Sequence, residues 1–509
     1  MKRITALFLM LILLVSLFGC ATEEKPYTPT GDALDDWEGS TVAPPVQKEQ
    51  NLTLAYYPNR SMNPFTCNDS TNRAIFPLLY QSLFSTNRNY EVIPILCDRY
   101  SVTPDMRTYT IYLAAATFSD GRLLTPEDAA ASLLAAKAGS YYGGRFTHIT
   151  GITATSDAVV ITLDTPMSDL PMLLDIPIVP ADQVDAENPI GTGPYVLDTT
   201  LGGNRLRRSS LWWCQSDLVV TASYIPLIEG TSPSQIRDQF EFADLTLVCA
   251  DPGSDTYADY RCDYELWDIE NGIFLYLGFN FNSPVFSIEE VRSAVTYAIN
   301  RDYLVESFYR GFARSATLPA SPQSPYYDAT LAERYRYDNS KLHEALKANN
   351  LIEGHVTLLL NSDDSLRLRA GRAIAEMLRA SGLVVTVEEV STSVFKWWIQ
   401  AGEYDLYLGQ TRLSANMDLS PFFAKKGSLN YGGMADTTAY AMCLEALANE
   451  GNYYNLHKEV MDRGLLCPIL FRSYAIYATR GLVTQLNPAR DNMFYYSIGK
   501  TMADAKINP

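Results

Sequence analysis

The fold class follows from residues 355–408, which read HVTLLLNSDDSLRLRAGRAIAEMLRASGLVVTVEEV and then STSVFKWWIQAGEYDLYL. Three short apolar runs predict strands, at 356–360, 384–390 and 405–408. Two segments with apolar side chains at helical spacing predict helices, at 366–380 and 394–400. Strands that alternate with helices pair in parallel, and the helices form the crossovers. This stretch therefore indicates an α/β fold.

The same two patterns recur elsewhere along the chain. Alternating or short apolar runs predict further strands at 51–57, 109–113, 159–163 and 274–281. Helical spacing predicts helices at 74–84 and 288–299. Thr125-Pro126-Glu127-Asp128 begins another helix, because Thr is a favoured N-cap, Pro is favoured at the first helical position and acidic residues favour the first turn. Asp128 is therefore interpreted as a partner of the helix dipole rather than a catalytic acid.

The composition is that of a folded, acidic protein with more than one domain. The 509 residues are 47% hydrophobic and 19% charged. An ordinary domain takes roughly 100–200 residues, so two or three domains are expected. The net charge of −18 argues against nucleic-acid binding, which requires clusters of Lys and Arg. The four histidines are widely separated, CxxC and GxSxG are absent, and the sequence predicts no metal, no cofactor and no enzymatic activity.

The N-terminus has the pattern of an export signal. A positively charged start precedes an apolar run at 4–18, which is shorter than the roughly 20 residues of a spanning helix, so 1–19 is predicted to be a signal peptide. Leu17-Phe18-Gly19-Cys20 resembles a bacterial lipobox, which predicts cleavage before Cys20 and lipidation of Cys20. An ordinary signal peptide with a chance Cys is the alternative. Residues 20–49 are rich in acidic residues and Pro and are predicted to be a disordered tether, with the lipid as the only anchor.

Seven short motifs follow one another along the remaining chain. They are MNP at 62–64, LYQSL at 79–83, YTIYLAAATFSDG at 109–121 with TPED at 125–128, IGTGPY at 190–195, RSSLWW at 208–213, LGFN at 277–280 with VRSAVTYAI at 291–299, and EYDL at 403–406. Together they resemble the extracellular solute-binding proteins of ABC importers, in the oligopeptide-, dipeptide- and nickel-binding group called family 5. Because the motifs occur in the family's order and spacing, the chain is identified as a member of that family.

The resemblance implies an α/β, two-lobed periplasmic-binding-protein-like fold of the large class, with the ligand cleft between the lobes. Lobe one is expected at 50–280, with an inserted subdomain at about 85–185, and lobe two at 281–479. Residues 480–509 are expected to return to lobe one. Gly191-Thr192-Gly193-Pro194 is expected to shape a bend between the lobes.

The resemblance also implies a function. The protein is expected to be extracytoplasmic, either lipid-anchored at the outer face of a bacterial cell membrane or periplasmic. It is expected to be a monomer that captures a peptide or peptide-like small solute and delivers it to the permease subunits of an ABC importer. A solute-sensing receptor of the same fold is the alternative within the class. A cell-surface hydrolase, with two carboxylates meeting in a cleft, is the alternative from another class.

Candidate ligand contacts are aromatic and polar residues near cleft positions implied by the resemblance, because aromatic rings provide large and rigid contact areas. These candidates are Tyr56, Tyr57, Asn63, Trp397, Trp398 and Tyr431. For each of them, packing in the core or on the surface is the competing interpretation.

Residues 409–418, GQTRLSANMD, bear most directly on the ligand. In peptide-binding relatives the matching stretch has a Trp and an early Asp that holds the α-ammonium of the peptide. Here Gln410 stands in place of the Trp, Arg412 and Leu413 stand where that Asp is expected, and Asp418 matches a later, structural Asp. A guanidinium favours a carboxylate or another anion, so binding of free-amino peptides is not expected. The alternative is that Arg412 faces solvent or pairs with Asp418.

Overall fold

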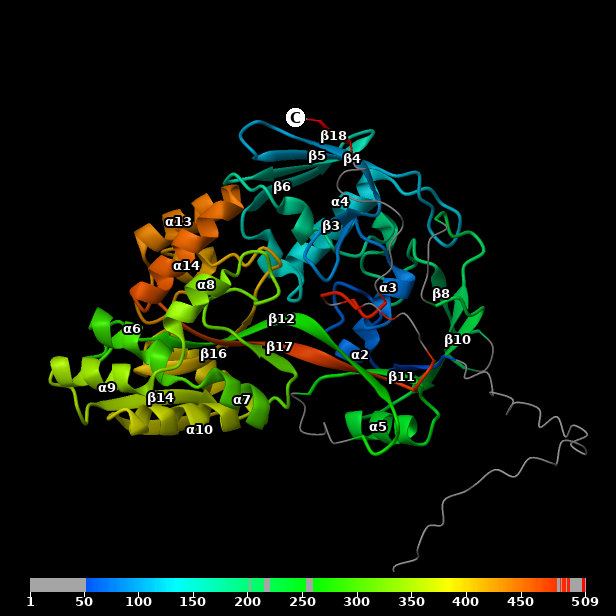
Figure 1. Ribbon diagram of the computed structural model, residues 1–509. Coiled ribbons are helices and arrows are strands. Elements are labelled where there is room, and N and C mark those ends of the chain that lie inside the picture. Colours follow the sequence, from blue (N-terminus) through cyan, green and yellow to red (C-terminus); the bar gives the residue numbers. More distant parts are fainter. Residues whose placement is uncertain are drawn as a thin grey trace, which may run out of the picture. The chain divides into compact units, whose positions relative to one another are not determined.

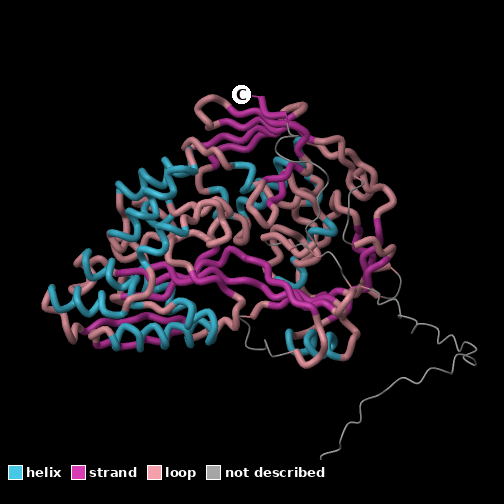
Figure 2. Tube along the Cα trace, viewed as in Figure 1, coloured by secondary structure: helices cyan, strands magenta, loops and turns pink. Residues whose placement is uncertain are grey.

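The computed structural model describes part of the chain, drawn in Figures 1 and 2. The described residues are 52–200, 203–214, 220–252, 260–482, 486, 488–490, 492–494 and 506–508. The chain divides into two compact units, 1–49 and 50–509, and all described residues belong to the second. The predicted signal peptide, the predicted lipidation site Cys20 and the predicted tether lie outside the described residues.

The largest sheet runs through the whole described unit (Figure 1). Its strands, in spatial order, are β15 (Val384–Val390), β14 (His355–Asn361), β16 (Leu406–Arg412), β12 (Glu265–Phe279), β17 (Cys467–Ala478), β11 (Leu247–Ala250), β1 (Leu54–Tyr56), β10 (Tyr224–Glu229), β9 (Arg205–Arg208) and β8 (Tyr195–Asp198), with β13 (Ala313–Ser315) paired to β17. β14 pairs in parallel with both β15 and β16, as the strand–helix alternation predicts. The predicted α/β class is confirmed.

Two long strands join the two ends of this sheet. β12 pairs with β16 through Phe279↔Leu406, and at its other end it pairs with β17 through Glu265↔Ala478. The register of β12 against β17 is interrupted between Glu270 and Phe274. β12 and β17 therefore extend from the N-terminal half of the unit, residues 52–250, into the C-terminal half, residues 280–466. Figure 2 shows both strands running the length of the sheet.

A second sheet and a short third one belong to the N-terminal half. The second contains β18 (Lys506–Asn508), β4 (Cys97–Val102), β5 (Thr108–Leu113), β7 (Ala158–Leu163) and β6 (Ile149–Ala154), and the third contains β2 (Phe84–Thr86) and β3 (Val92–Pro94). β18 pairs in parallel with β4, which attaches the C-terminal end of the described chain to the N-terminal half. Leu486, Ala489, Met493 and Phe494 pack in the same hydrophobic cluster as Leu54 and Leu247.

Helices cover the sheets. They are α2 (Ser70–Arg73), α3 (Phe76–Leu79), α4 (Pro126–Ala138), α5 (Pro233–Glu241), α6 (Glu289–Ala298), α7 (Arg301–Ser307), α8 (Ala329–Ala332), α9 (Asn339–Ala348), α10 (Ser365–Ala380), α11 (Thr392–Ala401), α12 (Ser420–Phe423), α13 (Thr437–Ala448) and α14 (Tyr453–Asp462). The predicted start of α4 is confirmed, because the Thr125 side chain accepts from Asp128 N and the Asp128 side chain accepts from Thr125 N. Asp128 is a capping residue, and its second oxygen accepts from Ala181 N at 2.8 Å.

Apolar packing also connects the two halves. One hydrophobic cluster combines Tyr90 and Met172 with residues of the C-terminal half, among them Tyr326, Leu419 and Tyr453. Polar contacts run beside this cluster, since Ser168 N donates to Leu447 O at 2.9 Å. The two halves are therefore in direct contact along one side of the structure.

Two expectations about the N-terminal half are wrong. The helix predicted at 74–84 is limited to α3, because Tyr80 has an extended backbone and Leu79 O accepts instead from Gly193 N at 3.0 Å. The same contact corrects the bend expected between the lobes. Gly191 and Gly193 lie against the backbone of Leu79, where a Cβ on either glycine would come within 2.6 Å of that backbone. The GTGPY segment is therefore a close backbone contact inside the N-terminal half.

Candidate functional site

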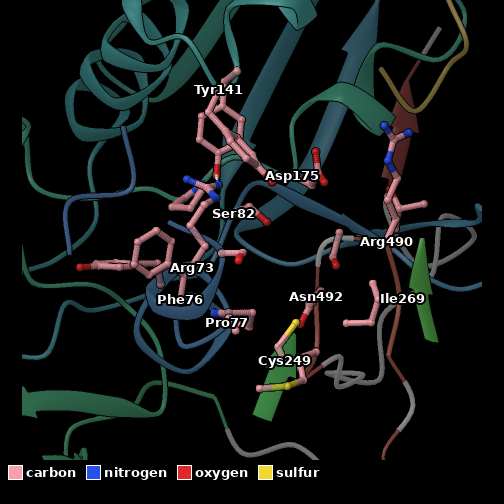
Figure 3. A pocket seen from close by; sticks show the side chains of 18 of the residues that line it. Arg73, Phe76, Pro77, Ser82, Tyr141, Asp175, Cys249, Ile269, Arg490 and Asn492 are labelled. Atoms are coloured by element: carbon pink, nitrogen blue, oxygen red, sulfur yellow. Dashed lines mark hydrogen bonds between the residues drawn. The ribbon is translucent and has the colours of Figure 1, made fainter. Parts of the chain in front are cut away.

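A cavity lies where the N-terminal half meets the long strands of the sheet, and Figure 3 shows it from close by. It surrounds about 890 Å³ of space that is partly open to solvent. The residues that line it include Arg73, Phe76, Gln81, Thr86, Tyr141, Tyr142, Arg145, Asp175, Cys249, Ile269, Tyr474, Arg490 and Asn492.

One wall of the cavity is a stack of aromatic rings around Arg73, the last residue of α2. The Arg73 guanidinium carbon lies 3.3 Å from the centre of the Tyr141 ring and 5.3 Å from that of Phe76. Arg73 also donates to Pro64 O and to the Tyr142 hydroxyl. Burial alone would lower the pKa of Arg73, but the neighbouring Tyr142 and Tyr141 raise it above its usual value. Arg73 therefore carries a permanent positive charge, and its contacts named here are aromatic rings, a carbonyl and a hydroxyl rather than a carboxylate.

A buried ion pair lies beside this stack. Arg145 donates to Asp175, and their side chains are 11% and 19% exposed. The Arg145 guanidinium also lies 4.9 Å from the centre of the Tyr142 ring. Asp175 is the only acidic residue that lines the cavity among the described residues, and it is held by Arg145.

Several polar atoms in the cavity wall have no hydrogen-bond partner among the described residues. The Gln81 amide oxygen accepts from Trp213 Nε1 at 2.8 Å, which fixes its orientation because the indole is only a donor. Its amide nitrogen Nε2 is buried and lacks an acceptor, and the Thr86 hydroxyl also lacks a partner. Gln81 and Thr86 are only 4% and 5% exposed. Asn492 Oδ1 and the Arg490 atoms Nε and Nη1 are likewise buried without a partner.

Arg490 reaches the cavity from a turn in which Ala489 and Asn492 exchange two backbone hydrogen bonds of 3.0 Å. Its Nη2 donates to Leu413 O, at the end of β16. The approach requires Gly272, which has φ +69°, because a Cβ there would overlap the Arg490 guanidinium. Figure 3 shows Arg490 and Asn492 on the same side of the cavity as Ile269.

The predicted site residue Arg412 lies against the walls of this cavity. Its guanidinium carbon lies 4.7 Å from the centre of the Tyr141 ring, and it donates to Asn271 O and to the Tyr474 hydroxyl. Both alternatives considered for Arg412 are wrong. It is partly buried, and Asp418 instead accepts from Ser420 N at 2.7 Å and lies 3.5 Å from His148 Nε2. Gln410, also on β16, accepts from Arg472 at 3.2 Å.

Two other predicted residues are in the core of the N-terminal half. Tyr56 is 6% exposed and belongs to the main hydrophobic cluster. Asn63 donates to Val184 O and Ala186 O, both at 2.7 Å, and accepts from Phe65 N at 2.8 Å, so it holds a loop. Tyr57, also considered, is buried beside Ile236 in a smaller cluster. None of the three lines the cavity.

Three further predicted residues lie in the C-terminal half. Trp397 and Trp398 on α11 line a shallow hollow with Asn280, Tyr404 and Asp405. Trp397 is 60% exposed. Tyr431 contacts Tyr407 edge to face and donates to Ser428 O. The structure thus brings Arg412 to the cavity and leaves the aromatic candidates elsewhere.

Sequence reasoning missed most of the cavity wall. Arg73 lies just before the helix predicted at 74–84 and outside every motif, and Arg490 follows all of the family motifs. Two signals were available: Gln81 lies in the LYQSL motif, and Tyr141-Tyr142 is a pair of aromatic residues shortly after the predicted helix that became α4. No group of three or more His, Cys, Asp or Glu positioned to hold a metal ion occurs in the described part of the chain.

The sequence and the fold can now be compared with known proteins. A family model of bacterial extracellular solute-binding proteins, family 5, matches residues 91–430. The chain belongs to this family. No helix within the described residues is sufficiently long and apolar to cross a membrane.

Relatives with curated descriptions cover part of the chain. Glutathione-binding protein GsiB of Escherichia coli O6:K15:H31 is 27% identical over 347 residues, which are 62% of this chain and 64% of that protein. GsiB of Salmonella paratyphi A is 26% identical over 341 residues, 64% of this chain and 66% of that protein. The chain therefore spans somewhat less than two thirds of the length of these relatives. No relative named here is a hydrolase, and the hydrolase alternative has no support.

Solved structures share the fold over nearly the whole folded unit. A putative peptide-binding protein, AppA, from Clostridium difficile has a TM-score of 0.72 at 15% identity, covering 87% of this chain and 98% of that one. NikZ from Campylobacter jejuni, in complex with Ni(L-His), has a TM-score of 0.64 at 17% identity, covering 89% and 97%. The predicted two-lobed periplasmic-binding-protein-like fold is confirmed.

Proposed function

We propose that this protein captures a small solute in the cavity beside the long strands and delivers it to the permease of an ABC importer, without chemical change. The observation that carries the proposal is the place of the cavity. Its walls come from the N-terminal half and from β12 and β17, while Arg412 of the C-terminal half contacts two wall residues, Tyr141 and Tyr474. A movement of one half against the other therefore alters the cavity, as hinge closure around a ligand requires.

The proposed lobes follow the boundaries implied by the family. Lobe one comprises 50–280 with 480–509, and lobe two comprises 281–479. The hydrophobic clusters support this division, because the largest one joins residues 52–269 with 486–494 and takes only Leu447, Ile476 and Ala478 of its buried members from 281–479. The interruption in β12 near Asn271 supports a hinge within the strands themselves, a few residues before the proposed boundary.

The ligand class is proposed to be a peptide or peptide-like small solute. The named relatives include glutathione-binding proteins, and glutathione is a small peptide with two carboxylates. Unmodified dipeptides to pentapeptides are expected to bind weakly or not at all, because an α-ammonium taken out of water needs a carboxylate partner. Glutathione differs from them, because its α-ammonium and one of its carboxylates are on the same carbon. Asp175 is already held by Arg145.

Binding without turnover is the test. The protein purified from its host is analysed by native mass spectrometry for a co-purifying solute, and that solute is then added back during thermal unfolding. A bound ligand stabilises by RT ln(1 + [L]/Kd), and recovery of the solute unchanged after incubation distinguishes a binder from a hydrolase. Consumption of the solute would refute the proposal. The sensor alternative has no specific observation in its favour.

Anchoring is proposed to occur through lipidated Cys20, as the lipobox resemblance suggests. Cys20→Ala should move the protein from the membrane fraction to the soluble fraction or leave the signal peptide uncleaved, because each buried CH₂ of a lipid chain contributes about 0.8 kcal/mol. Cys262→Ala is the control, since Cys262 is a partly exposed cysteine of the folded unit. Tight membrane association of a correctly cleaved Cys20→Ala protein would contradict the proposal.

A further inference from the structure

The cavity carries an unbalanced set of charges. Three arginines line it, Arg73, Arg145 and Arg490, and one acid, Asp175, is paired with Arg145. Neither Arg73 nor Arg490 forms an ion pair with a carboxylate of the described residues within 4.0 Å. The described wall of the cavity therefore carries a net positive charge, which favours an anionic ligand.

The hydrogen-bond donors of the cavity also favour an anionic ligand. Arg490 uses Nη2 on Leu413 O, and its buried Nε and Nη1 have no acceptor. Gln81 Nε2 is buried with no acceptor, and its orientation is fixed by Trp213. The Thr86 hydroxyl is a further buried donor. Buried polar groups in native proteins are almost always satisfied, and these donors have no acceptor among the described residues, so they favour a ligand that brings acceptor atoms into the cavity.

We propose that the cavity binds an organic oxyanion, a carboxylate or a phosphate ester, whose charged group is received by Arg490, Gln81 and Thr86. This inference rests on the proposed function and names the ligand class of the same site. The charged oxygens accept from the donors that are left unsatisfied, and guanidinium groups bind such oxyanions through directed N–H bonds. The rest of the ligand lies against Phe76, Tyr141 and Tyr474.

The geometry also explains why Arg490 lacks a carboxylate of its own. Its side chain is held by Leu413 O after β16 and passes over Gly272 in β12. The Arg490 guanidinium is therefore positioned by the Leu413 carbonyl and by the space that Gly272 leaves. Neither of them neutralises its positive charge, so the charge can interact with an anionic ligand. Arg490 is part of a turn that belongs to the N-terminal half, so an anion bound to it lies between that half and β16.

The test uses the full-length protein and a panel of carboxylic acids with their matching primary amides, together with phosphate esters and their parent alcohols. Glutathione and N-acetylated dipeptides are among the acids. Thermal unfolding and calorimetric titration are measured for wild type, Arg490→Gln and Arg480→Gln. Arg480 is a matched control, because it is 64% exposed and pairs with Asp263 on the surface.

At least one acid or phosphate ester should stabilise the wild type, and its neutral counterpart should bind at least 10-fold more weakly. Arg490→Gln should lower the affinity for the anion by about 10- to 100-fold, the range expected for loss of a hydrogen bond to a charged group. Arg480→Gln should change this affinity less than threefold. Comparison of the two ligand series shows whether the oxyanion is a carboxylate or a phosphate.

A ligand-free measurement separates binding from folding. Arg490→Gln removes a charge that has no carboxylate partner among the described residues, so its unfolding temperature without ligand should equal or exceed that of the wild type. Gly272→Ala should displace the Arg490 guanidinium and lower the affinity for the anion, although Arg490 itself is unchanged. Equal binding of neutral and anionic ligands, or unchanged affinity in Arg490→Gln, overturns the inference but not the proposed function. The absence of stabilisation by every acid and phosphate ester also overturns the inference, whereas failure of every solute, charged or neutral, counts against both.

Discussion

Asp169 is a carboxyl group placed at the contact between the two halves. Its Oδ2 accepts from the Tyr326 hydroxyl at 2.9 Å, and its Oδ1 is buried without a partner. Burial raises the pKa of Asp169 to about 7, although the hydrogen bond from Tyr326 and the nearby Asn416 amide act to lower it. The folded state therefore retains a proton that the unfolded chain releases near pH 4.

The proton retained by Asp169 makes stability depend on pH in one direction. Between about pH 4 and pH 7 the Asp169 carboxyl holds a proton in the folded state that it has lost in the unfolded state, so its contribution to the free energy of unfolding should fall as the pH rises, by on the order of a few kcal/mol. Asp169→Asn should reduce this slope in urea unfolding measured at pH 4.5 and 7.5. Asp157→Asn, at an exposed turn, is the control. An Asp169→Asn protein with the full wild-type slope would contradict the assignment.

His148 adds to the same trend. Burial alone would lower the pKa of His148, but Asp418 and Asp164 on its two sides raise it above its usual value. A histidine with a raised pKa stabilises the folded state below about pH 6.5, and this contribution is lost as the pH rises through the folded-state value. Some slope should therefore remain in Asp169→Asn.

Single residues were the hardest level to predict from the sequence. Arg412 was found because it departs from a family motif, and the structure places it at the cavity wall. Asn63, another motif residue, instead holds a loop. Arg490 had no signal, because its role depends on Gly272 and Leu413, which are distant in sequence. A motif identifies positions that a family keeps, and many of these serve the backbone rather than the ligand.

Among the elements, the contact between the GTGPY segment and α3 gives a sharp prediction. A Cβ on Gly193 would lie 2.5 Å from the Leu79 carbonyl carbon, and a backbone atom cannot move aside as a side chain can. Gly193→Ala should destabilise the protein by about 3 kcal/mol, at the upper end for overpacking. Gly144→Ala, where a Cβ meets nothing within 4 Å, is the control. Equal unfolding midpoints for the two variants would contradict the contact.

Elements were predictable where their signals are local. The capping box of α4 and the strands and helices between 355 and 412 were readable, because each depends on residues within a few positions of one another. The helix predicted at 74–84 failed because Leu79 bonds to a segment more than a hundred residues away. The length of β12 was also underestimated, since its first part pairs only with β17.

At the scale of the whole molecule, a small set of contacts closes the two halves against each other. His148 Nε2 lies 2.9 Å from the Ser420 hydroxyl, which joins the N-terminal half to α12. In the hinge closure that we propose, loss of this contact should favour the open state, and it changes no residue that lines the cavity. His148→Ala should increase the ligand-free radius of gyration in small-angle X-ray scattering.

The affinity of His148→Ala for its ligand should fall by up to about 10-fold, because the closed state becomes less populated. His343→Ala is the control, since His343 contacts Ser381 within the C-terminal half. An unchanged scattering profile in His148→Ala would show that this contact does not govern closure.

The order of strands in the large sheet has a consequence for how the chain folds. β1 lies between β10 and β11, which it pairs with through Leu54↔Leu227 and Leu54↔Leu247. The other edge of β11 pairs with β17. The centre of the sheet therefore cannot form until segments separated by more than a hundred residues have met. Folding rates fall as contacts become more distant in sequence, so refolding after dilution from urea should be slow, reaching seconds in stopped-flow fluorescence. A chain that folds slowly remains unfolded for longer, which suits the export that we predict from the first residues of the sequence.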